Sequence, residues 1–244
     1  MKVSIIIPAY NEEKLLPRCL KSIFSTHLPE DYEIIVVNNA STDRTEEIAK
    51  SFSGVKVVTE LKKGITKARQ AGFEAACGDI LVFFDADTVI PPDWFRTAVA
   101  KFKSKSKLVG VSGPYRFEAI SWWAKGLEWF YNYIIMPTGE FIWKFILRQG
   151  GIMLLGGNFA VKREALTAVN GFNTEIDFYG EDTNLTRRIA KIGEIYYTNK
   201  LFVYSSPRRF EGEGRLKLII KYVINFLGEW IFKKPVNKSY EDFR

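Results

Sequence analysis

Five short apolar runs, separated by segments of helical pattern, constrain the fold of this chain more than any other feature of its sequence. Most are rich in β-branched residues, which is typical of strands that are covered on both faces. Strands that alternate with helices form βαβ units, so the pattern predicts an α/β protein with a mostly parallel sheet and helices on both faces. The five runs are residues 3–7, 33–37, 55–58, 80–84 and 108–112.

Short local patterns predict where the helices between these runs begin. Asp43 and Glu46 have the spacing of a capping box, in which each side chain bonds a backbone N–H at the start of a helix. A further helix is expected after Gly64 and through Ala76. Pro92 is expected as the first residue of a helix that runs to about Lys103.

The size and composition of the chain favour one large folded domain. It has 244 residues, of which 47% are apolar and 26% charged, so a packed core is expected and disorder is not. The net charge of +7 is compatible with nucleic acid, an anionic membrane or a phosphate-rich ligand. Because there is no block of five or six Lys or Arg residues and no nucleic-acid motif, we expect no nucleic-acid partner.

The few cysteines and the single histidine limit the chemistry that is available. Cys19 and Cys77 are expected to be reduced structural thiols, and His27 is the only histidine. The apolar run at residues 3–7 is too short for a secretory signal. We therefore expect a cytoplasmic protein, with peripheral contact at the cytoplasmic face of a membrane as an option.

Polar residues follow three of the five runs. They are Tyr10–Asn11, Asn38–Asn39 and Asp85–Asp87. The carboxyl ends of parallel strands meet at one edge of a sheet, and ligands bind there. Within this set Tyr10 offers a flat face for a base, and Asn11 is expected to cap the helix that follows.

Asp85, Ala86 and Asp87 end the most apolar run and predict a metal site. Residues i and i+2 of a strand point the same way, so the two carboxylates are expected side by side. Mg²⁺ is often held by one or two carboxylates together with substrate phosphates. A solvated turn that caps the next helix is the alternative. The glycine-rich fingerprint of dinucleotide enzymes and the P-loop pattern are both missing after the first strand, where the chain reads "PAYNEE".

Six motifs occur in order over about residues 1–200, and together they resemble glycosyltransferase family 2 with its GT-A fold. They read "IIIPAYNEE", "IIVVNNASTDRT", "GITKARQAG", "LVFFDADT", "GGNFAVKREAL" and "GEDTNLTRRI". The resemblance implies a Rossmann-like sheet, a UDP- or GDP-linked sugar donor, and Mg²⁺ or Mn²⁺ on Asp85 and Asp87. It places donor binding at Pro8, Tyr10, Glu12, Asn39, Arg69, Asp85, Ala86, Gly157 and Asn158.

The resemblance also implies a catalytic base in the "ED" pair. We assign this role to Asp182, which would take the proton of an acceptor hydroxyl, and we expect Glu181 to orient the acceptor or the base. A single base without a nearby nucleophile favours inversion at the sugar carbon. The alternative is two acids that only complement the dipole of a helix.

This chain departs from the family at two positions. Asn39 replaces an aspartate that usually accepts from the base, so the base, uracil or guanine, stays open. A late histidine is missing, and Arg208 and Arg209 stand in that region, where they would clamp phosphate oxygens. Surface charges near a membrane are an equal alternative for these two arginines.

The predicted domain spans residues 1–213, with a nucleotide-binding half (1–112) and an acceptor-binding half (113–213). The second half contains an aromatic-rich insertion, with six aromatic residues in 122–133. Residues 214–244 are expected to hold an amphipathic helix that either lies in a bilayer interface or packs on its own domain. The acceptor is expected to be a sugar or a lipid-linked molecule, and these two features favour a lipid-linked or membrane-proximal one.

Two other functions compete with glycosyl transfer. A sugar-phosphate nucleotidyltransferase would use a nucleotide and Mg²⁺, but it would need a glycine-rich basic loop after the first strand. A non-catalytic carbohydrate-binding module would leave both acidic pairs without a use.

Overall fold

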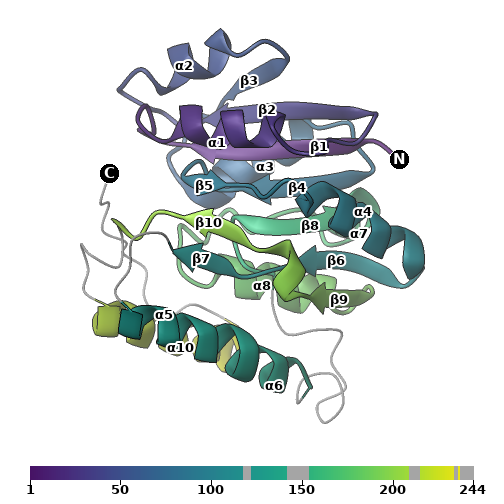
Figure 1. The fold of residues 1–244 in the computed structure, drawn as a ribbon, viewed down its shortest axis with the longest axis vertical. Helices are drawn as coiled ribbons and strands as arrows, with labels where there is room; N and C mark the ends of the chain where they lie inside the picture. Colours follow the sequence, from purple (N-terminus) through teal and green to yellow (C-terminus); the bar gives the residue numbers. More distant parts are fainter. Residues whose placement is uncertain (118–121, 142–153, 209–214, 234–235, 237–244) are drawn as a thin grey trace.

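Strands and helices alternate along the chain as predicted, in a computed structural model that describes residues 1–117, 122–141, 154–208, 215–233 and 236 (Figure 1). The main sheet has the strand order β3-β2-β1-β4-β8-β6-β9. Each of the five apolar runs lies within a strand, which confirms the α/β prediction. The strands are β1 (Val3–Ala9), β2 (Tyr32–Asn38), β3 (Val55–Thr59), β4 (Ile80–Phe84), β6 (Leu108–Ser112), β8 (Asn158–Lys162) and β9 (Glu194–Tyr197).

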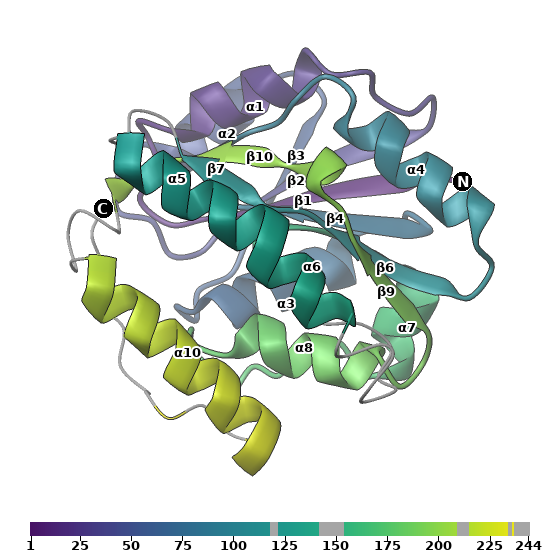
Figure 2. The same cartoon turned by 60° about the horizontal axis from the view of Figure 1, so that its bottom comes forward.

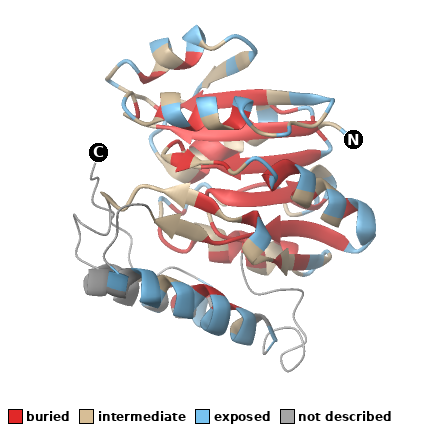
Figure 3. Ribbon diagram, in the orientation of Figure 1, coloured by how far each residue is buried: buried red, intermediate tan, exposed pale blue. Residues whose placement is uncertain are grey.

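Helices cover both faces of this sheet (Figures 1 and 2). Side chains alternate along a strand, so Ile5 and Ile7 of β1 join one core while Ile6 joins the other. The first core is closed by α1 (Leu16–Phe24), α2 (Thr45–Ser51) and α4 (Trp94–Ser104). The second is closed by α3 (Ile65–Ala75), α7 (Arg163–Ala168) and α8 (Glu181–Ile189). The inner strands β1, β4, β6 and β8 are buried almost throughout, whereas the edge strand β3 is only partly covered (Figure 3).

The direction of β8 decides what gathers at the functional edge of the sheet. β8 is antiparallel to β4 and β6, whereas the other paired strands of this sheet are parallel. The amino end of β8 therefore meets the carboxyl ends of β1, β2, β4 and β6. We call this edge the rim. A small sheet of β5 (Thr88–Val89), β10 (Val203–Ser205) and β7 (Tyr115–Phe117) lies beside it.

Three local predictions about helix starts are wrong. The helix α4 begins at Trp94, whose N–H bonds the carbonyl of Pro91, so Pro92 lies in the turn before it. Asp43 accepts the N–H of Thr45 at 3.0 Å, which is one half of a capping box. The other half is missing, because the Glu46 carboxylate accepts from the Asn38 side chain and not from the backbone N–H of Asp43.

Asn11 does not cap α1, which begins five residues later. It adopts a positive φ of 51°, and its side chain accepts the N–H of Thr42 at 2.8 Å. A left-handed conformation is tolerated by Asn more readily than by most residues. Asn11 therefore joins the loops after β1 and β2 at the rim.

The aromatic segment forms one continuous helical rod. It consists of α5 (Trp122–Phe130), a π-helical turn η1 (Tyr131–Ile135) and α6 (Met136–Phe141). The helical rod continues through Pro137 and Gly139, although both residue types disfavour a helix interior. Pro137 is the second residue after the π-helical turn, and such turns mark places where a helix departs from its regular hydrogen-bond ladder. Most described side chains of the rod are exposed (Figure 3).

The C-terminal helix α10 (Arg215–Phe232) packs on α8, and three residues of its polar stripe, Asn225, Gly228 and Glu229, are buried. Glu229 is fully buried and accepts from Asn184 at 2.7 Å and Arg187 at 3.1 Å. Ile231 and Phe232 are 65% and 70% exposed. The helix thus packs on its own domain, which was one of the two predicted placements, while Ile231 and Phe232 face outward. The placement in a bilayer interface stays a prediction. Within the described residues, no helix has the length and apolar character needed to cross a membrane.

Candidate active site

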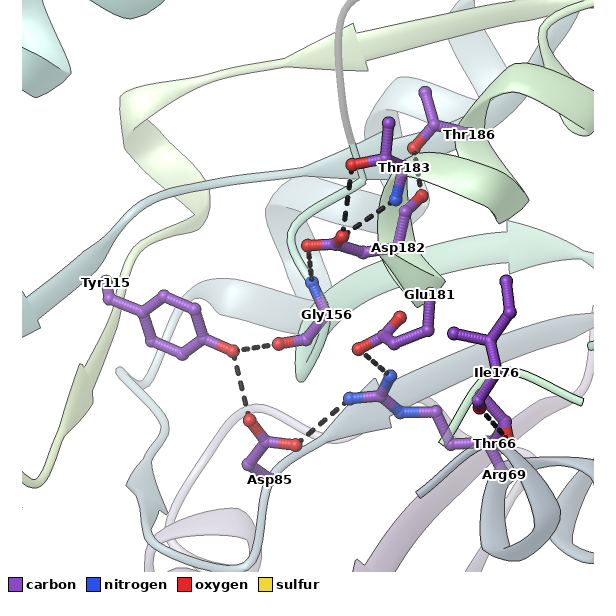
Figure 4. Close-up of polar contacts among 10 residues, drawn as sticks. All are labelled: Thr66, Arg69, Asp85, Tyr115, Gly156, Ile176, Glu181, Asp182, Thr183 and Thr186. Atoms are coloured by element: carbon purple, nitrogen blue, oxygen red, sulfur yellow. Dashed lines mark hydrogen bonds and ion pairs between the residues drawn. The ribbon is translucent and has the colours of Figure 1, made fainter. Parts of the chain in front are cut away.

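Arg69 lies at the centre of the site and joins the two acidic motifs that the sequence singled out. It projects from α3, and its side chain is only 2% exposed. Its Nη1 lies 2.6 Å from Glu181 Oε1, and its Nη2 lies 3.2 Å from Asp85 Oδ1 (Figure 4). A buried guanidinium requires paired anions. The arginine therefore fixes the end of β4 relative to the start of α8.

Tyr115 makes a second connection between the same two motifs. Its hydroxyl lies 3.2 Å from Asp85 Oδ2 and also contacts the carbonyl oxygen of Gly156 (Figure 4). The N–H of Gly156 in turn points to Asp182 Oδ2 at 3.4 Å. Burial raises the pKa of Tyr115 well above its usual value, and the charge of Asp85 adds to this effect. Tyr115 therefore stays a neutral donor.

Gly156 and Gly157 have no side chains, and the carboxylates of Glu181 and Asp85 occupy the space that side chains there would fill. A Cβ on Gly157 would lie 2.0 Å from Asp85 Oδ2, and Gly157 has a φ of +87°, which other residues rarely adopt. A Cβ on Gly156 would lie 2.6 Å from Glu181 Oε1. The "GG" before β8 thus serves the packing of the site, because any side chain there would displace a carboxylate.

Glu181 and Asp182 begin α8 in different surroundings. Burial raises the pKa of Glu181 to about 7 despite the opposing effect of Arg69, and Glu181 Oε2 has no hydrogen-bond partner among the described residues. Asp182 Oδ1 accepts the N–H of Thr183 at 2.7 Å, and burial raises the pKa of Asp182 as well. Both carboxyls therefore bind a proton more readily than a solvated one, as a general base requires.

Asp87 and Glu12 lie on the other side of Asp85 and share one arginine. Arg208 Nη1 lies 2.9 Å from Glu12 Oε2, its Nη2 contacts Glu12 Oε1, and its Nη2 lies 3.3 Å from Asp87 Oδ2. The structure thus brings Glu12, Asp87 and Arg208 together. Arg209 lies outside the described residues.

The candidate metal motif Asp85–Asp87 lies in a turn after β4, so its two carboxylates are not arranged as they would be on a strand. The N–H of Thr88 bonds the carbonyl of Asp85 at 3.1 Å, so residues 85–88 form a turn and strand alternation does not apply. Asp85 contacts Arg69 and Tyr115, whereas Asp87 contacts Arg208. Ala86 is buried in the core, where only its backbone could contact a donor.

The carboxylates of the site could hold a divalent cation only if a bound diphosphate or water supplied the remaining oxygen ligands. Carboxylate oxygens suit Mg²⁺ and Mn²⁺. Within the part of the chain that the structure describes, however, no group of three or more His, Cys, Asp or Glu side chains is arranged to hold a metal ion. Asp85 and Asp87 would therefore provide two ligands, and the remaining ones would be diphosphate oxygens or water.

Asn39 and Tyr10, expected to contact the base, already have partners. Asn39 is 4% exposed, and its Nδ2 donates to the carbonyls of Glu60 and Lys62 at 3.0 and 2.9 Å. Its Oδ1 accepts the N–H of Gly64 at 2.8 Å. An aspartate could not donate to those carbonyls. Lys63 Nζ lies over one face of the Tyr10 ring, 3.8 Å from its centre, and the stacking of a base on Tyr10 stays a prediction.

Pro8 and Asn158 serve the scaffold. Pro8 lies within β1 and pairs with Val37 of β2. The pairing of β1 with β4 ends two residues earlier, at Ile6. Asn158 is fully buried, and its amide bonds the carbonyls of Gly113 and Leu201, both at 2.8 Å, and the indole N–H of Trp94 at 3.0 Å. The structure does not bring Asn158 to the surface of the site.

Tyr115 and Gly156 are site residues that the sequence reasoning missed. Tyr115 follows the fifth apolar run by three residues, so the rule that found Asp85 would also have found it. Gly156 required knowledge that β8 runs antiparallel, because only then does the start of that strand reach the rim.

Comparisons with known proteins identify the family. The family model described as "Glycosyl transferase family 2" matches residues 4–169, which is more than half of the chain. This chain belongs to glycosyl transferase family 2. The expected family and fold are therefore confirmed.

Curated relatives in this family carry glycosyltransferase names. The probable glycosyltransferase YdaM of Bacillus subtilis is 32% identical over 208 residues, which cover 79% of this chain and 47% of YdaM. A dolichol-phosphate mannosyltransferase of Pyrococcus furiosus is 29% identical, over 89% of this chain and 60% of the relative. The chain thus spans about half the length of the curated relatives it matches.

Solved structures support the fold. The mannosyltransferase PcManGT from Pyrobaculum calidifontis, in complex with GDP-Man and Mn²⁺, has a TM-score of 0.76 and 24% identity, over 94% of this chain and 64% of that one. TarS 1-349 of S. aureus has a TM-score of 0.67 and 19% identity, over 95% and 72% of the two chains. At these identities the likeness shows the α/β fold of the family.

Proposed function

We propose that this chain transfers a sugar from a UDP- or GDP-linked donor to an acceptor hydroxyl or phosphate, with inversion at the sugar carbon. The observation that carries the proposal is one continuous polar network at the rim (Figure 4). Arg69 joins Asp85 to Glu181, and Tyr115 joins Asp85 to Gly156 and so to Asp182. A diphosphate-binding motif and a candidate base are thereby held in one rigid arrangement, as an in-line displacement requires.

Asp182 would act as the base in this displacement. As the acceptor oxygen attacks the anomeric carbon, its proton passes to Asp182, and the bond to the donor diphosphate breaks with its electron pair on the leaving oxygen. A divalent cation held by Asp85 and Asp87, when bound, would neutralise charge on the diphosphate. Glu181, tied to Arg69, would orient the acceptor.

The binding half of the proposal is tested with UDP and GDP, each with and without Mn²⁺, in a thermal-shift measurement. One nucleotide should raise the melting temperature in the presence of Mn²⁺, and Asp87→Ala should remove that rise. If neither nucleotide stabilises the protein, the proposal fails.

The catalytic half is tested with Asp182→Asn, which should keep the Mn²⁺-dependent nucleotide shift. It should lose transfer by at least about 100-fold, as expected when a general base is removed. Glu181→Gln should lose less. Equal loss of binding and transfer in Asp182→Asn would give Asp182 a structural role instead.

The acceptor side favours contact with a membrane surface. The rod α5–η1–α6 carries large exposed apolar side chains, among them Trp122 at 86% and Trp129 at 57%. The outward face of α10 adds Ile231 and Phe232. Exposed aromatic patches and a net charge of +7 suit an anionic bilayer interface. We infer a lipid-linked acceptor held at this surface, in line with the P. furiosus relative, whose name specifies dolichol phosphate.

Sedimentation with anionic vesicles tests this contact. The double variant Trp122→Ser and Trp129→Ser should lower the bound fraction. Leu61→Ser is the matched control, because Leu61 is 80% exposed but follows β3 at the opposite edge of the sheet. Equal vesicle binding by all three proteins would contradict the membrane contact.

A further inference from the structure

Arg208 occupies a position where its charge competes with a metal ion. It follows β10 and reaches Glu12, which lies 196 residues earlier in the chain. The same guanidinium lies 3.3 Å from Asp87 Oδ2. The three side chains are 27%, 5% and 15% exposed for Arg208, Glu12 and Asp87, so these contacts are only partly screened by water.

The charges around this contact require a cation. Glu12, Asp85 and Asp87 lie on one side of the rim, with Arg69 committed to Asp85 and to Glu181. Carboxylates that lie close together repel unless a positive charge lies between them. In the structure Arg208 provides that charge for Glu12 and Asp87. A divalent ion on the same Asp87 oxygen would be repelled by the guanidinium.

The contacts of Arg208 with its two partners are unequal. Both of its terminal nitrogens contact the carboxylate of Glu12, whose own N–H donates to Thr45 Oγ1 at 2.7 Å. Only Nη2 approaches Asp87, and at a longer distance. A bidentate pair is stronger than a single contact. Arg208 can therefore leave Asp87 while Glu12 still holds it.

We propose that Arg208 is a tethered cation that neutralises Asp87 before the donor binds and gives this carboxylate up to the divalent ion. The inference rests on the proposed function, because it assumes that the ion arrives with a nucleoside diphosphate. The diphosphate then offers new acceptors to the released guanidinium. Metal and nucleotide binding are thereby coupled: the ion alone must displace Arg208 from Asp87, whereas the ion with diphosphate gives Arg208 another partner.

The test measures Mn²⁺ binding by the electron paramagnetic resonance signal of the free ion, with and without UDP or GDP. Arg208→Ala should bind Mn²⁺ alone about three- to tenfold more tightly than the unchanged protein, since the competing charge is gone. The gain in Mn²⁺ affinity that the nucleotide gives should shrink. Arg208→Gln should change both quantities in the same direction.

Arg96→Ala is the matched control, because Arg96 pairs with Asp93 on the surface, where its side chain is 68% exposed. It should leave both affinities unchanged. Unchanged or weaker binding of Mn²⁺ alone by both Arg208 variants would overturn the inference and leave the proposed function standing. If the unchanged protein binds neither Mn²⁺ nor nucleotide, the proposed function and this inference both fail.

Discussion

Arg69 and Glu181 are 112 residues apart in the chain, and their side chains meet at 2.6 Å in the interior of the site. The pair joins a helix of the nucleotide half to the first residue of α8. Because the arginine also contacts Asp85, the pair sets the distance between the turn after β4 and the start of α8, which hold the proposed diphosphate motif and the proposed base. Four predictions follow from this arrangement and its surroundings.

Replacing Arg69 by Met should lower the free energy of unfolding by about 3–5 kcal/mol, because Asp85 and Glu181 lose a buried counter-charge. Urea unfolding followed by circular dichroism measures the change. Adding Glu181→Gln should restore part of the loss. The control Arg96→Met removes an exposed ion pair and should cost at most about 1 kcal/mol. Similar losses in the two single variants would contradict a central role for Arg69.

Stability should fall as pH rises through the titration of Glu181. Burial raises the pKa of this carboxyl from 4.5 to about 7, so the folded protein binds more protons than the unfolded chain between these values. The contribution is present below about pH 4.5 and is lost above about pH 7, with a total of no more than about 3 kcal/mol. Urea unfolding at pH 5 and pH 8 should show a smaller difference in Glu181→Gln. An equal difference in that variant would assign the pH effect to other groups.

Substituting Gly157 by Ala should displace Asp85 and weaken Mn²⁺ binding in the presence of nucleotide. Gly54→Ala is a close control, because Gly54 has a φ of +80° but no atom within 4 Å of an added Cβ. Both variants pay a backbone cost of about 1–2 kcal/mol. Only Gly157→Ala adds the overlap with the carboxylate. Equal Mn²⁺ affinity in the two variants would show that Asp85 does not bind the ion.

Asn39→Asp should destabilise the protein by about 1–3 kcal/mol, since the carbonyls of Glu60 and Lys62 lose their donors. Asn173→Asp should be nearly neutral, because half-buried Asn173 acts as an acceptor for the N–H of Glu175, and an aspartate accepts equally well. Denaturation midpoints compare the two. A neutral Asn39→Asp would mean that the loop 60–64 is held by other contacts.

Local patterns were sufficient for the five strands of the apolar runs and for the rim where they end. The parallel order of these strands places Asp85 beside the loops after β1 and β2, but the runs did not give the reversed strand β8 or the edge strand β9. The pairing of Arg69 was beyond such reasoning, because it depends on a side chain meeting partners 16 and 112 residues away. Asn39 donates hydrogen bonds only because residues 60–64 fold back over it and place the carbonyls of Glu60 and Lys62 beside its amide, and a local pattern carries no information about that fold.

The C-terminal helix shows why a pattern alone leaves orientation open. Its narrow polar stripe could face water or the domain, because a helical wheel carries no information about the neighbouring element. The presence of Asn184 and Arg187 on α8 decides the matter, since they give Glu229 hydrogen bonds that it would lose in an apolar setting.

The reversed strand β8 has a consequence for how members of such a family diverge. β6 ends at Ser112 and β8 begins at Asn158, and Ser112 pairs with Phe159, so the chain leaves the sheet and re-enters it at the same edge. A change of length between Phe117 and Leu154 would thus leave the strand order of the sheet intact. An exchange that reached Tyr115, Gly156 or Gly157 would also remove contacts to Asp85 and Glu181, so we expect length variation in such a family to stop short of these three residues.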